Sequence, residues 1–256
     1  MGIRSSAARS ACAWLTAGLL GGCASYMTPG GGVSIPEITS PDVADAMSRV
    51  PAATFPARIV VARVQASGYE SRSSQGYGRG KYSVMTTRDI ETEADFMRLG
   101  AMPEVSAVGT LNRLLLPNVL NSANDLRHAA AQLQGDIVML YTIDTSFRTD
   151  TKQIGPMQLV AMGFFPNKKA RVTSTCAVAF IDTRTGFVYG VAESTANEEQ
   201  RSDVWNKEEA IEKARAKAER TAFTQALGDV EKLWGQIAAR ATANRGAGGG
   251  APPASP

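Results

Sequence analysis

The stretch Asp136-Ile-Val-Met-Leu-Tyr-Thr-Ile-Asp144 decides the fold of this chain. A continuous apolar run of this length is typical of a central strand that is covered on both faces. An Ala-rich segment over residues 124–134 precedes it, and Gly135 then predicts a helix that ends on a C′ glycine. We therefore expect an α/β fold, with a mixed-sheet α+β fold as the alternative. The expected arrangement is a single three-layer domain with a central mixed sheet, helices on its faces and a long C-terminal amphipathic helix.

A β-hairpin is predicted further along the chain. Residues 172–181 alternate, and the turn Asp182-Thr183-Arg184-Thr185-Gly186 places glycine where a positive φ is needed. Residues 187–194 supply the partner strand. One face of the first strand is expected to hold Val172, Ser174, Cys176, Val178 and Phe180.

The remaining elements of the domain are indicated less sharply. The β-branched run over residues 58–65 predicts the first strand, and residues 68–81 read as a long loop rich in Ser, Gly, Tyr and Arg. Further expected elements are strands at 82–88 and 111–116, a helix at 91–99, and a strand or buried loop at 158–165.

The clearest helix runs from Lys207 to about Ala239. Its apolar residues recur at steps of three and four, and either Asp203 or Asn206 provides a candidate N-cap. Gly228 is a candidate site for a bend. The opposite, solvated face is expected to carry Glu212, Arg215, Lys217, Glu219, Arg220 and Lys232.

The N-terminus reads as a secretory signal. A basic start with Arg4 and Arg9 precedes an apolar run over residues 11–20, which is about half the length that spans a bilayer. The motif Leu20-Gly21-Gly22-Cys23 that follows resembles the lipobox of bacterial lipoproteins. That resemblance implies cleavage before Cys23 and lipidation of its thiol. Because Ala24 rather than Asp follows, it also implies the outer membrane, with the protein facing the periplasm.

The domain itself resembles a group of periplasmic lipoprotein domains. The helix–Gly-Asp–strand segment 129–138, the hairpin segment 180–186 and the opening strand 58–64 are similar to those of curli-secretion lipoproteins. They are also similar to penicillin-binding-protein activator lipoproteins and to the amino-terminal domain of the Tol-system propeller protein. Tyr141, Asp144 and the 182–190 hairpin look like the rhombotarget lipoproteins. The resemblance covers about residues 55–235 and concerns the fold.

Four regions are therefore expected. Residues 1–22 form the signal, 23–54 a lipidated cysteine and flexible tether, 55–239 the α/β domain, and 240–256 a disordered tail of mostly Ala, Gly and Pro.

Composition narrows the function. The chain has 27 basic and 24 acidic side chains, and cleavage after residue 22 removes Arg4 and Arg9, which leaves 25 against 24. This balance gives no sign of a nucleic-acid partner. Cys12 leaves with the signal and Cys23 is expected to be lipidated, so Cys176 has no intramolecular partner. We expect it to be a buried structural thiol, with a reactive thiol as the alternative.

The sequence presents no recognisable catalytic, cofactor or metal motif. The one histidine, His128, lies on the Ala-rich helix and is expected at the surface. No G-x-S-x-G elbow or phosphate-binding loop is present. Asp136, Asp144 and Asp182 are expected to cap strands and turns. The loop over residues 69–82 is either a protein-binding surface or a solvated loop.

These observations favour a binding or assembly-accessory protein that is anchored to the envelope membrane by lipid and binds another envelope protein. No catalysis, cofactor or metal is expected. One alternative is an envelope enzyme that acts on cell wall or glycan. The other is an oligomeric transport or secretion accessory lipoprotein. The sequence leaves the oligomeric state open.

Overall fold

A computed structural model describes residues 31–39, 42–71, 73–149, 168–202 and 207–248. The helices are α1 (Ile35–Ile38), α2 (Val43–Ser48), α3 (Glu93–Gly100), α4 (Ala123–Gln132) and α5 (Lys207–Gly248), with a 3-10 turn at Arg113–Leu115. The strands are β1 (Ala57–Ala66), β2 (Arg79–Gly80), β3 (Tyr82–Met85), β4 (Val105–Thr110), β5 (Val119–Leu120), β6 (Ile137–Thr149), β7 (Lys168–Asp182) and β8 (Val188–Ser202).

The central sheet is mixed and has the order β3-β1-β6-β7-β8, with β4 also paired to β1. Strands β1 and β6 run parallel, whereas β6, β7 and β8 form an antiparallel meander. One edge of β1 pairs with two strands. The first half of β1 pairs with β4, and the second half pairs with β3. A short parallel pair, β2 and β5, forms a second sheet.

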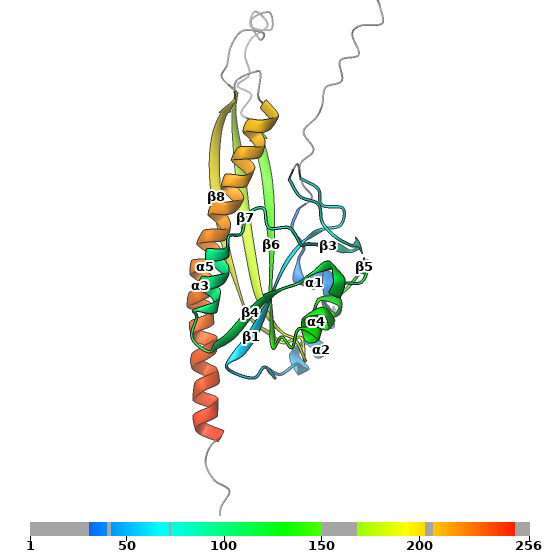
Figure 1. The fold of residues 1–256 in the computed structure, drawn as a ribbon, viewed down its shortest axis with the longest axis vertical. Helices are drawn as coiled ribbons and strands as arrows, with labels where there is room; N and C mark the ends of the chain where they lie inside the picture. The colour runs from blue at the N-terminus through cyan, green and yellow to red at the C-terminus, as the bar shows by residue number, and fades with distance from the viewer. Residues whose placement is uncertain (1–30, 40–41, 72, 150–167, 203–206, 249–256) are drawn as a thin grey trace, which may run out of the picture.

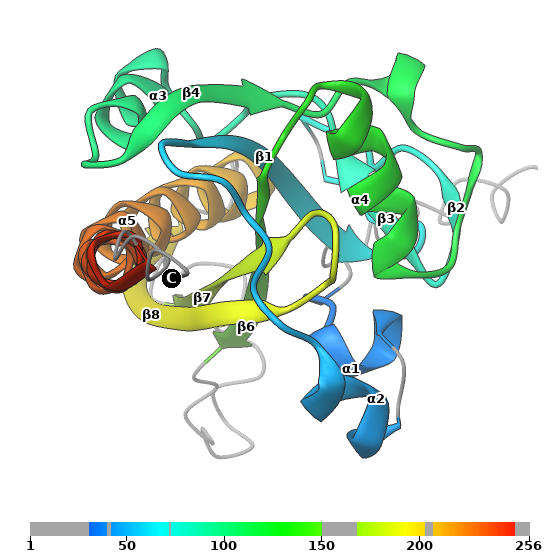
Figure 2. The same ribbon diagram turned by 90° about the horizontal axis from the view of Figure 1, so that it is seen from below.

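Each face of the sheet packs against its own set of helices. Alternate residues of β1 divide accordingly: Ile59 and Val61 lie in the core beneath α3 and α5, and Val60 and Ala62 lie in the core beneath α4. Figure 2 shows α5 on one side of the sheet and α4, α1 and α2 on the other. The expected fold class is therefore confirmed, because both faces of the central strands are covered.

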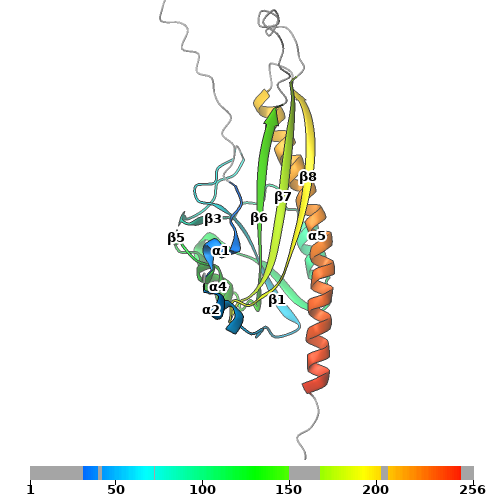
Figure 3. The same ribbon diagram turned by 180° about the vertical axis from the view of Figure 1, so that it is seen from behind.

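The three antiparallel strands extend beyond this layered core as an arm. Strand β1 pairs with β6 only as far as Tyr141, whereas β6 and β7 remain paired to Thr149 and Ala170. Figures 1 and 3 show the arm rising beside the first half of α5. Val172 of the arm packs there against Ala214 and Ala218 of α5.

The junction between α4 and β6 explains why a glycine is needed at position 135. The left-handed residue after α4 is Gln134, with φ 55°, so the predicted C′ glycine is wrong by one position. Gly135 is instead needed for close packing, because a Cβ there would lie 2.5 Å from Val60 Cγ2. The helix therefore packs directly on β1 at the point where β6 begins.

Two predicted boundaries of the domain are wrong. Residues 31–54 were expected to be a flexible tether, yet Val33 and Ile38 are buried in the α4-side core. The expected disorder from residue 240 is also wrong as far as Gly248, because α5 continues to that residue. Alanine-rich sequence favours helix, and Ile237 and Ala238 anchor this last part of α5 in the core. Residues 249–256 lie outside the described residues.

One further strand is displaced from its expected position. Residues 105–110 form β4, and the segment predicted as a strand at 111–116 contains the 3-10 turn. Asn112 explains the turn, since its side chain accepts a hydrogen bond from Leu114 N at 3.0 Å. Gly228 does not interrupt α5. The predicted segment 158–165 and the candidate caps Asp203 and Asn206 lie outside the described residues.

The predicted solvated face of α5 is wrong at two positions. Arg215 and Glu219 are each only 1% exposed. Arg215 Nη1 lies 2.6 Å from Glu219 Oε2, and Arg63 Nη2 of β1 lies 3.4 Å from the same oxygen. Arg63 Nη1 also contacts Asp89 Oδ1 at 2.6 Å. We call Arg63, Asp89, Glu91, Arg215 and Glu219 the buried charge cluster.

The buried charge cluster lies between α5 and the sheet, where the arm meets the layered core. Tyr141 donates a hydrogen bond to Glu91, and Thr145 donates one to Glu219 Oε1 at 2.9 Å. The periodicity of α5 predicted that Arg215 and Glu219 face the solvent. A periodic pattern carries no information about Arg63, which lies on a distant strand and is their partner. Pairing of this kind is what makes burial of charged side chains tolerable.

Candidate functional site

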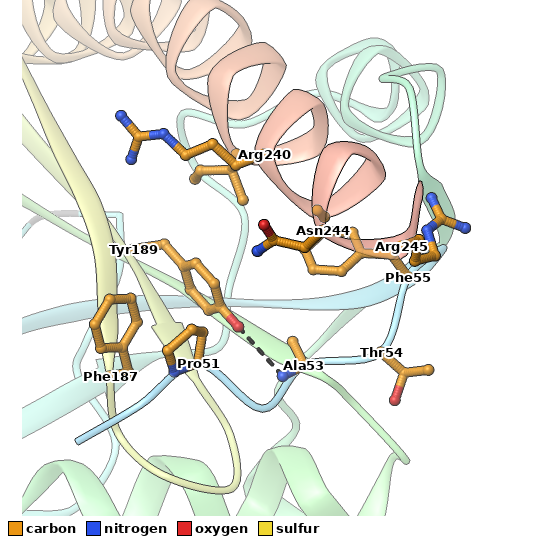
Figure 4. Close-up of a pocket in the computed structure, with 11 residues that line it drawn as sticks. Pro51, Ala53, Thr54, Phe55, Phe187, Tyr189, Arg240, Asn244 and Arg245 are labelled. Carbon is orange, nitrogen blue, oxygen red and sulfur yellow. Dashed lines mark hydrogen bonds between the residues drawn. The ribbon is translucent and has the colours of Figure 1, made fainter. Parts of the chain in front are cut away.

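A groove opens between the last turns of α5, the start of β8 and the segment that leads into β1. Its volume is about 510 Å³, which lies in the range of ligand-binding pockets. Figure 4 shows the side chains that surround it. The lining residues are Pro51, Ala53, Thr54, Phe55, Phe187, Tyr189, Ile237, Arg240, Ala241, Asn244 and Arg245. We call this pocket the α5–β8 groove.

The wall formed by residues 51–55 is held in place by Asp182 at the end of β7. Asp182 Oδ2 accepts hydrogen bonds from Ala52 N at 2.7 Å and from the Tyr189 hydroxyl at 2.9 Å. Ala53 N in turn donates to the Tyr189 hydroxyl oxygen at 3.2 Å, the bond drawn in Figure 4. Burial, together with the adjacent Asp182 carboxylate, raises the pKa of Tyr189, which keeps its hydroxyl protonated. The predicted turn role of Asp182 is confirmed and extends to this wall.

Aromatic side chains form the floor and one side of the groove. Phe187 and Tyr189 pack edge to face with ring centroids 5.2 Å apart. Phe55 packs against Trp234 of α5 with centroids 6.0 Å apart, and Trp234 is completely buried. Rigid aromatic surface of this kind gives a large apolar contact area.

Two arginines lie at the rim of the groove. Arg240 is exposed, and Arg245 forms an ion pair with Glu104 Oε2 at 2.7 Å. No acidic, histidine or cysteine side chain is among the described residues that line the groove. The arrangement suits an apolar group that lies next to a negative charge, and its lining offers no acid–base pair.

Asp182 makes the stability of this site depend on pH. Burial acts to raise the pKa of Asp182, but hydrogen bonds from Thr185 N, Ala52 N, the Tyr189 hydroxyl and Arg184 N outweigh it and hold the pKa below its usual value. A depressed pKa in the folded state means that the carboxylate stabilises the protein above about pH 4, and that this stabilisation is lost as the pH falls further. We expect the free energy of unfolding of the wild-type protein to fall more between pH 6 and pH 3 than that of Asp182→Asn.

Urea unfolding followed by circular dichroism at several pH values measures this difference. At pH 7, Asp182→Asn should cost about 1.5–3 kcal/mol, since hydrogen bonds to a charged group are weakened. Asp144→Asn is a matched control, because Asp144 is exposed on β6. Parallel pH curves for wild type and Asp182→Asn would contradict the assignment.

The other residues singled out from the sequence do not converge on the groove. His128 is exposed on α4, as predicted. Cys176 is buried beneath α5, and burial raises the pKa of its thiol to about 12, which confirms a structural role. Asp136 accepts a hydrogen bond from Arg58 N at 3.0 Å between two strands, in line with its predicted capping role. Cys23 lies outside the described residues.

Sequence reasoning missed the α5 side of the groove. Residues 240–256 were read as a disordered tail, yet Arg240, Ala241, Asn244 and Arg245 line the groove from the last turns of the helix. The signal was present in the spacing, because Ile237, Ala241 and Asn244 continue the three- and four-residue steps of the helix.

The described residues contain no cluster of three or more His, Cys, Asp or Glu side chains that could hold a metal ion. None of the helices in the described ranges combines the length and apolar character that a membrane span requires.

No family model matches the chain, and no curated protein matches it. Among solved structures, the chain is similar to protein XCC0632 from Xanthomonas campestris, described under the family model DUF330, with 12% identity and a TM-score of 0.33 over 74% of this chain and 92% of that one. It is similar to lipoprotein GNA1162 from Neisseria meningitidis, with 12% identity and a TM-score of 0.28 over 62% and 94% of the two chains. A third similar structure is the hypothetical protein CT253 from Chlamydia trachomatis, with 11% identity and a TM-score of 0.28 over 69% and 96%.

Proposed function

We propose that this chain is a non-catalytic accessory protein of the bacterial envelope that is anchored through Cys23 to the outer membrane and faces the periplasm. It binds an extended segment of another envelope protein in the α5–β8 groove. The observation that carries the proposal is the groove itself: an aromatic, acid-free pocket of about 510 Å³ with arginines at its rim. The segment that fits it carries an aromatic or branched aliphatic side chain next to acidic residues.

The surface beside the groove supports a protein partner. Val50 precedes the groove residue Pro51 and is 63% exposed. An exposed apolar side chain next to a groove adds to the surface that a docked protein segment can cover. Anchoring by lipid confines the protein to the membrane surface and raises its effective concentration there.

Lipidation is tested by replacing the modified thiol. We expect Cys23→Ser to abolish incorporation of radiolabelled palmitate and to move the protein out of the membrane fraction, because the acyl chains provide the anchor. Cys12→Ser is the matched control: it changes a thiol within the signal and should leave both readouts unchanged. Unaltered labelling and fractionation of Cys23→Ser would contradict the anchor.

The choice of membrane is tested separately. On a sucrose density gradient, the wild-type protein should travel with outer-membrane markers in an enterobacterial host. Ala24→Asp should shift it to the inner-membrane fraction. Wild-type protein in the inner-membrane fraction would contradict the outer-membrane assignment.

Occupancy of the groove is tested by site-specific photo-crosslinking in cells. A benzoylphenylalanine at Thr54, on the rim, is expected to give an adduct with a second envelope protein, whereas the same group at Lys213, exposed on the first half of α5, is not. Arg240→Glu should reduce the Thr54 adduct by about tenfold, because it reverses the charge that attracts the acidic flank. The matched control is Lys232→Glu, which reverses an exposed charge elsewhere on α5.

The outcomes separate the alternatives. Equal yields of adduct from Thr54 and Lys213 would contradict binding in the groove. A Thr54 adduct whose yield is unchanged by Arg240→Glu would contradict it as well. An adduct to a second copy of this chain would favour the oligomeric accessory lipoprotein, and an adduct within the chain to residues 249–256 would make its own tail the occupant. Release of soluble fragments from purified cell wall by the protein would favour the enzyme.

A further inference from the structure

A second pocket lies on the opposite face of the sheet, beside α4. Its volume is about 470 Å³, and it is formed where α1, α2, the start of α4 and the β7–β8 turn meet. Figure 2 shows α1, α2 and α4 gathered on this side. Three cationic side chains line it, Arg49, Lys81 and Arg127, against one acidic side chain, Asp45. We call it the α4 pocket.

Two of the cations are held close together at the β7–β8 turn. A Cβ placed on Gly186 would lie 3.1 Å from Arg127 Nη1 and 3.4 Å from Arg49 Nη1, so both guanidinium groups reach the same point. Burial, and then the positive charge of Arg49, lowers the pKa of Arg127, although the Asp182 carboxylate acts in the opposite direction. Bringing like charges together is unfavourable unless an anion is placed between or beside them.

Arg127 has no carboxylate partner within 4.0 Å among the described residues. Its Nε donates to Thr183 O at 2.9 Å and its Nη1 to Asn124 Oδ1 at 2.7 Å, and Nη2 donates to Arg184 O. These three bonds fix the guanidinium and leave two of its five N–H donors uncommitted. The guanidinium of Arg127 is therefore fixed in orientation, positively charged and able to donate hydrogen bonds to a ligand.

The other two cations also keep free donors. Lys81 is exposed, and its Nζ donates a hydrogen bond to Glu37 O at 3.4 Å. Arg49 donates to Asp45 Oδ2 at 2.5 Å and to Gly186 O at 3.4 Å. Asp45 pairs with Arg49, and the Asp182 carboxylate offsets part of the charge of Arg127, so the three cations leave the pocket lining with a net positive charge.

The N-terminus of α4 itself is not the anion site. Asp125 accepts hydrogen bonds from Asn121 N at 2.8 Å and from Ser122 N at 2.9 Å, and so already places a carboxylate at the positive end of the helix dipole. An anion in the α4 pocket is held by side chains.

We propose that the α4 pocket binds a phosphate monoester carried on a small polar group. A phosphate monoester carries a charge of about −1.5 to −2 at pH 7, which is opposite in sign to the net charge of the pocket lining, and its oxygens suit the forked donors of arginine. The amide and hydroxyl side chains of Asn121, Asn124 and Thr185 line the remaining space and suit the hydroxyl groups of a sugar or headgroup. This site is independent of the α5–β8 groove and does not rest on the function proposed for it.

Isothermal titration calorimetry of the full-length protein in nonionic detergent tests the proposal with two probes. Glucose 1-phosphate represents a soluble sugar phosphate, with glucose as its control. Short-chain dihexanoylphosphatidic acid represents a lipid headgroup, with dihexanoylphosphatidylcholine as its control. Binding of either phosphate probe, but not of its control, is the expected result, and the probe that binds identifies the source.

Variants assign the binding to this pocket. Lys81→Gln and Arg49→Gln should each weaken binding by about tenfold, because each removes a hydrogen bond from a charged donor. Lys213→Gln is the matched control, since it removes an exposed lysine on α5 and should leave the affinity unchanged. Lys81 is exposed, so Lys81→Gln should melt at the wild-type temperature, which separates loss of binding from loss of folding.

Absence of binding by both phosphate probes would overturn the proposal. Affinities that are unaffected by Lys81→Gln and Arg49→Gln would overturn it equally, because the phosphate would then lie elsewhere.

Discussion

Replacing Arg63 with methionine is expected to destabilise the protein by about 3–5 kcal/mol. Arg63 lies in the middle of the buried charge cluster, and its guanidinium contacts Asp89 Oδ1 at 2.6 Å, Glu91 Oε1 at 3.6 Å and Glu219 Oε2 at 3.4 Å. Methionine fills much of the same space but leaves three carboxylates with Arg215 as the remaining cation of the cluster. Urea unfolding followed by circular dichroism at pH 7 measures the loss.

The matched control is Arg171→Met on strand β7. Arg171 pairs with Glu199 at 2.8 Å, and both side chains are 53% exposed. An exposed pair of this kind contributes about 0–1 kcal/mol, so the control should lose far less stability than Arg63→Met. Equal losses would show that burial of the cluster does not matter.

Trp234→Ala is the second change expected to have a large effect, again about 3–5 kcal/mol. Trp234 is completely buried between Phe55 and Phe180, with ring centroids 6.0 and 5.1 Å away, and its Nε1 donates to Pro103 O at 2.7 Å. Alanine removes the ring, leaves a cavity and strands the Pro103 carbonyl. Thermal and urea unfolding measure the loss.

Leu114→Ala serves as the control, because Leu114 is 93% exposed and its truncation should change stability by less than about 0.5 kcal/mol. Phe55 lines the α5–β8 groove and rests on Trp234, so Trp234→Phe, which retains a ring, should preserve more of the Thr54 crosslink than Trp234→Ala. A Trp234→Ala protein with wild-type stability would contradict the packing described here.

Local patterns in the sequence were sufficient for most of the fold. The apolar run before Asp144 predicted β6, the alternation over residues 172–181 predicted the inward face of β7, and Gly186 has the expected positive φ of 74°. Each of these signals is carried by neighbours in the chain, because strand burial, alternation and turn geometry depend on residues that are close in sequence. The segment that became β4 gave no clear alternation, and it was assigned to the wrong residues.

The buried charge cluster and the α4 pocket depend on contacts between residues that are distant in sequence. Arg215 and Glu219 read as solvated on a helical wheel, and they are buried because Arg63, about 150 positions away, lies opposite them. The α4 pocket likewise joins Arg49, Lys81 and Arg127 from three separate parts of the chain.

The sequence by itself determined the α/β class, the position of the central strands and hairpin, and the candidate lipidation of Cys23, since each is encoded in a short contiguous pattern. Only the tertiary structure decided that residues 31–39, 42–54 and 240–248 belong to the folded body and that several of them line its pockets. The physical reason is that these segments have too little apolar surface to order on their own, and they gain order from hydrogen bonds and packing against β7, β8 and the core.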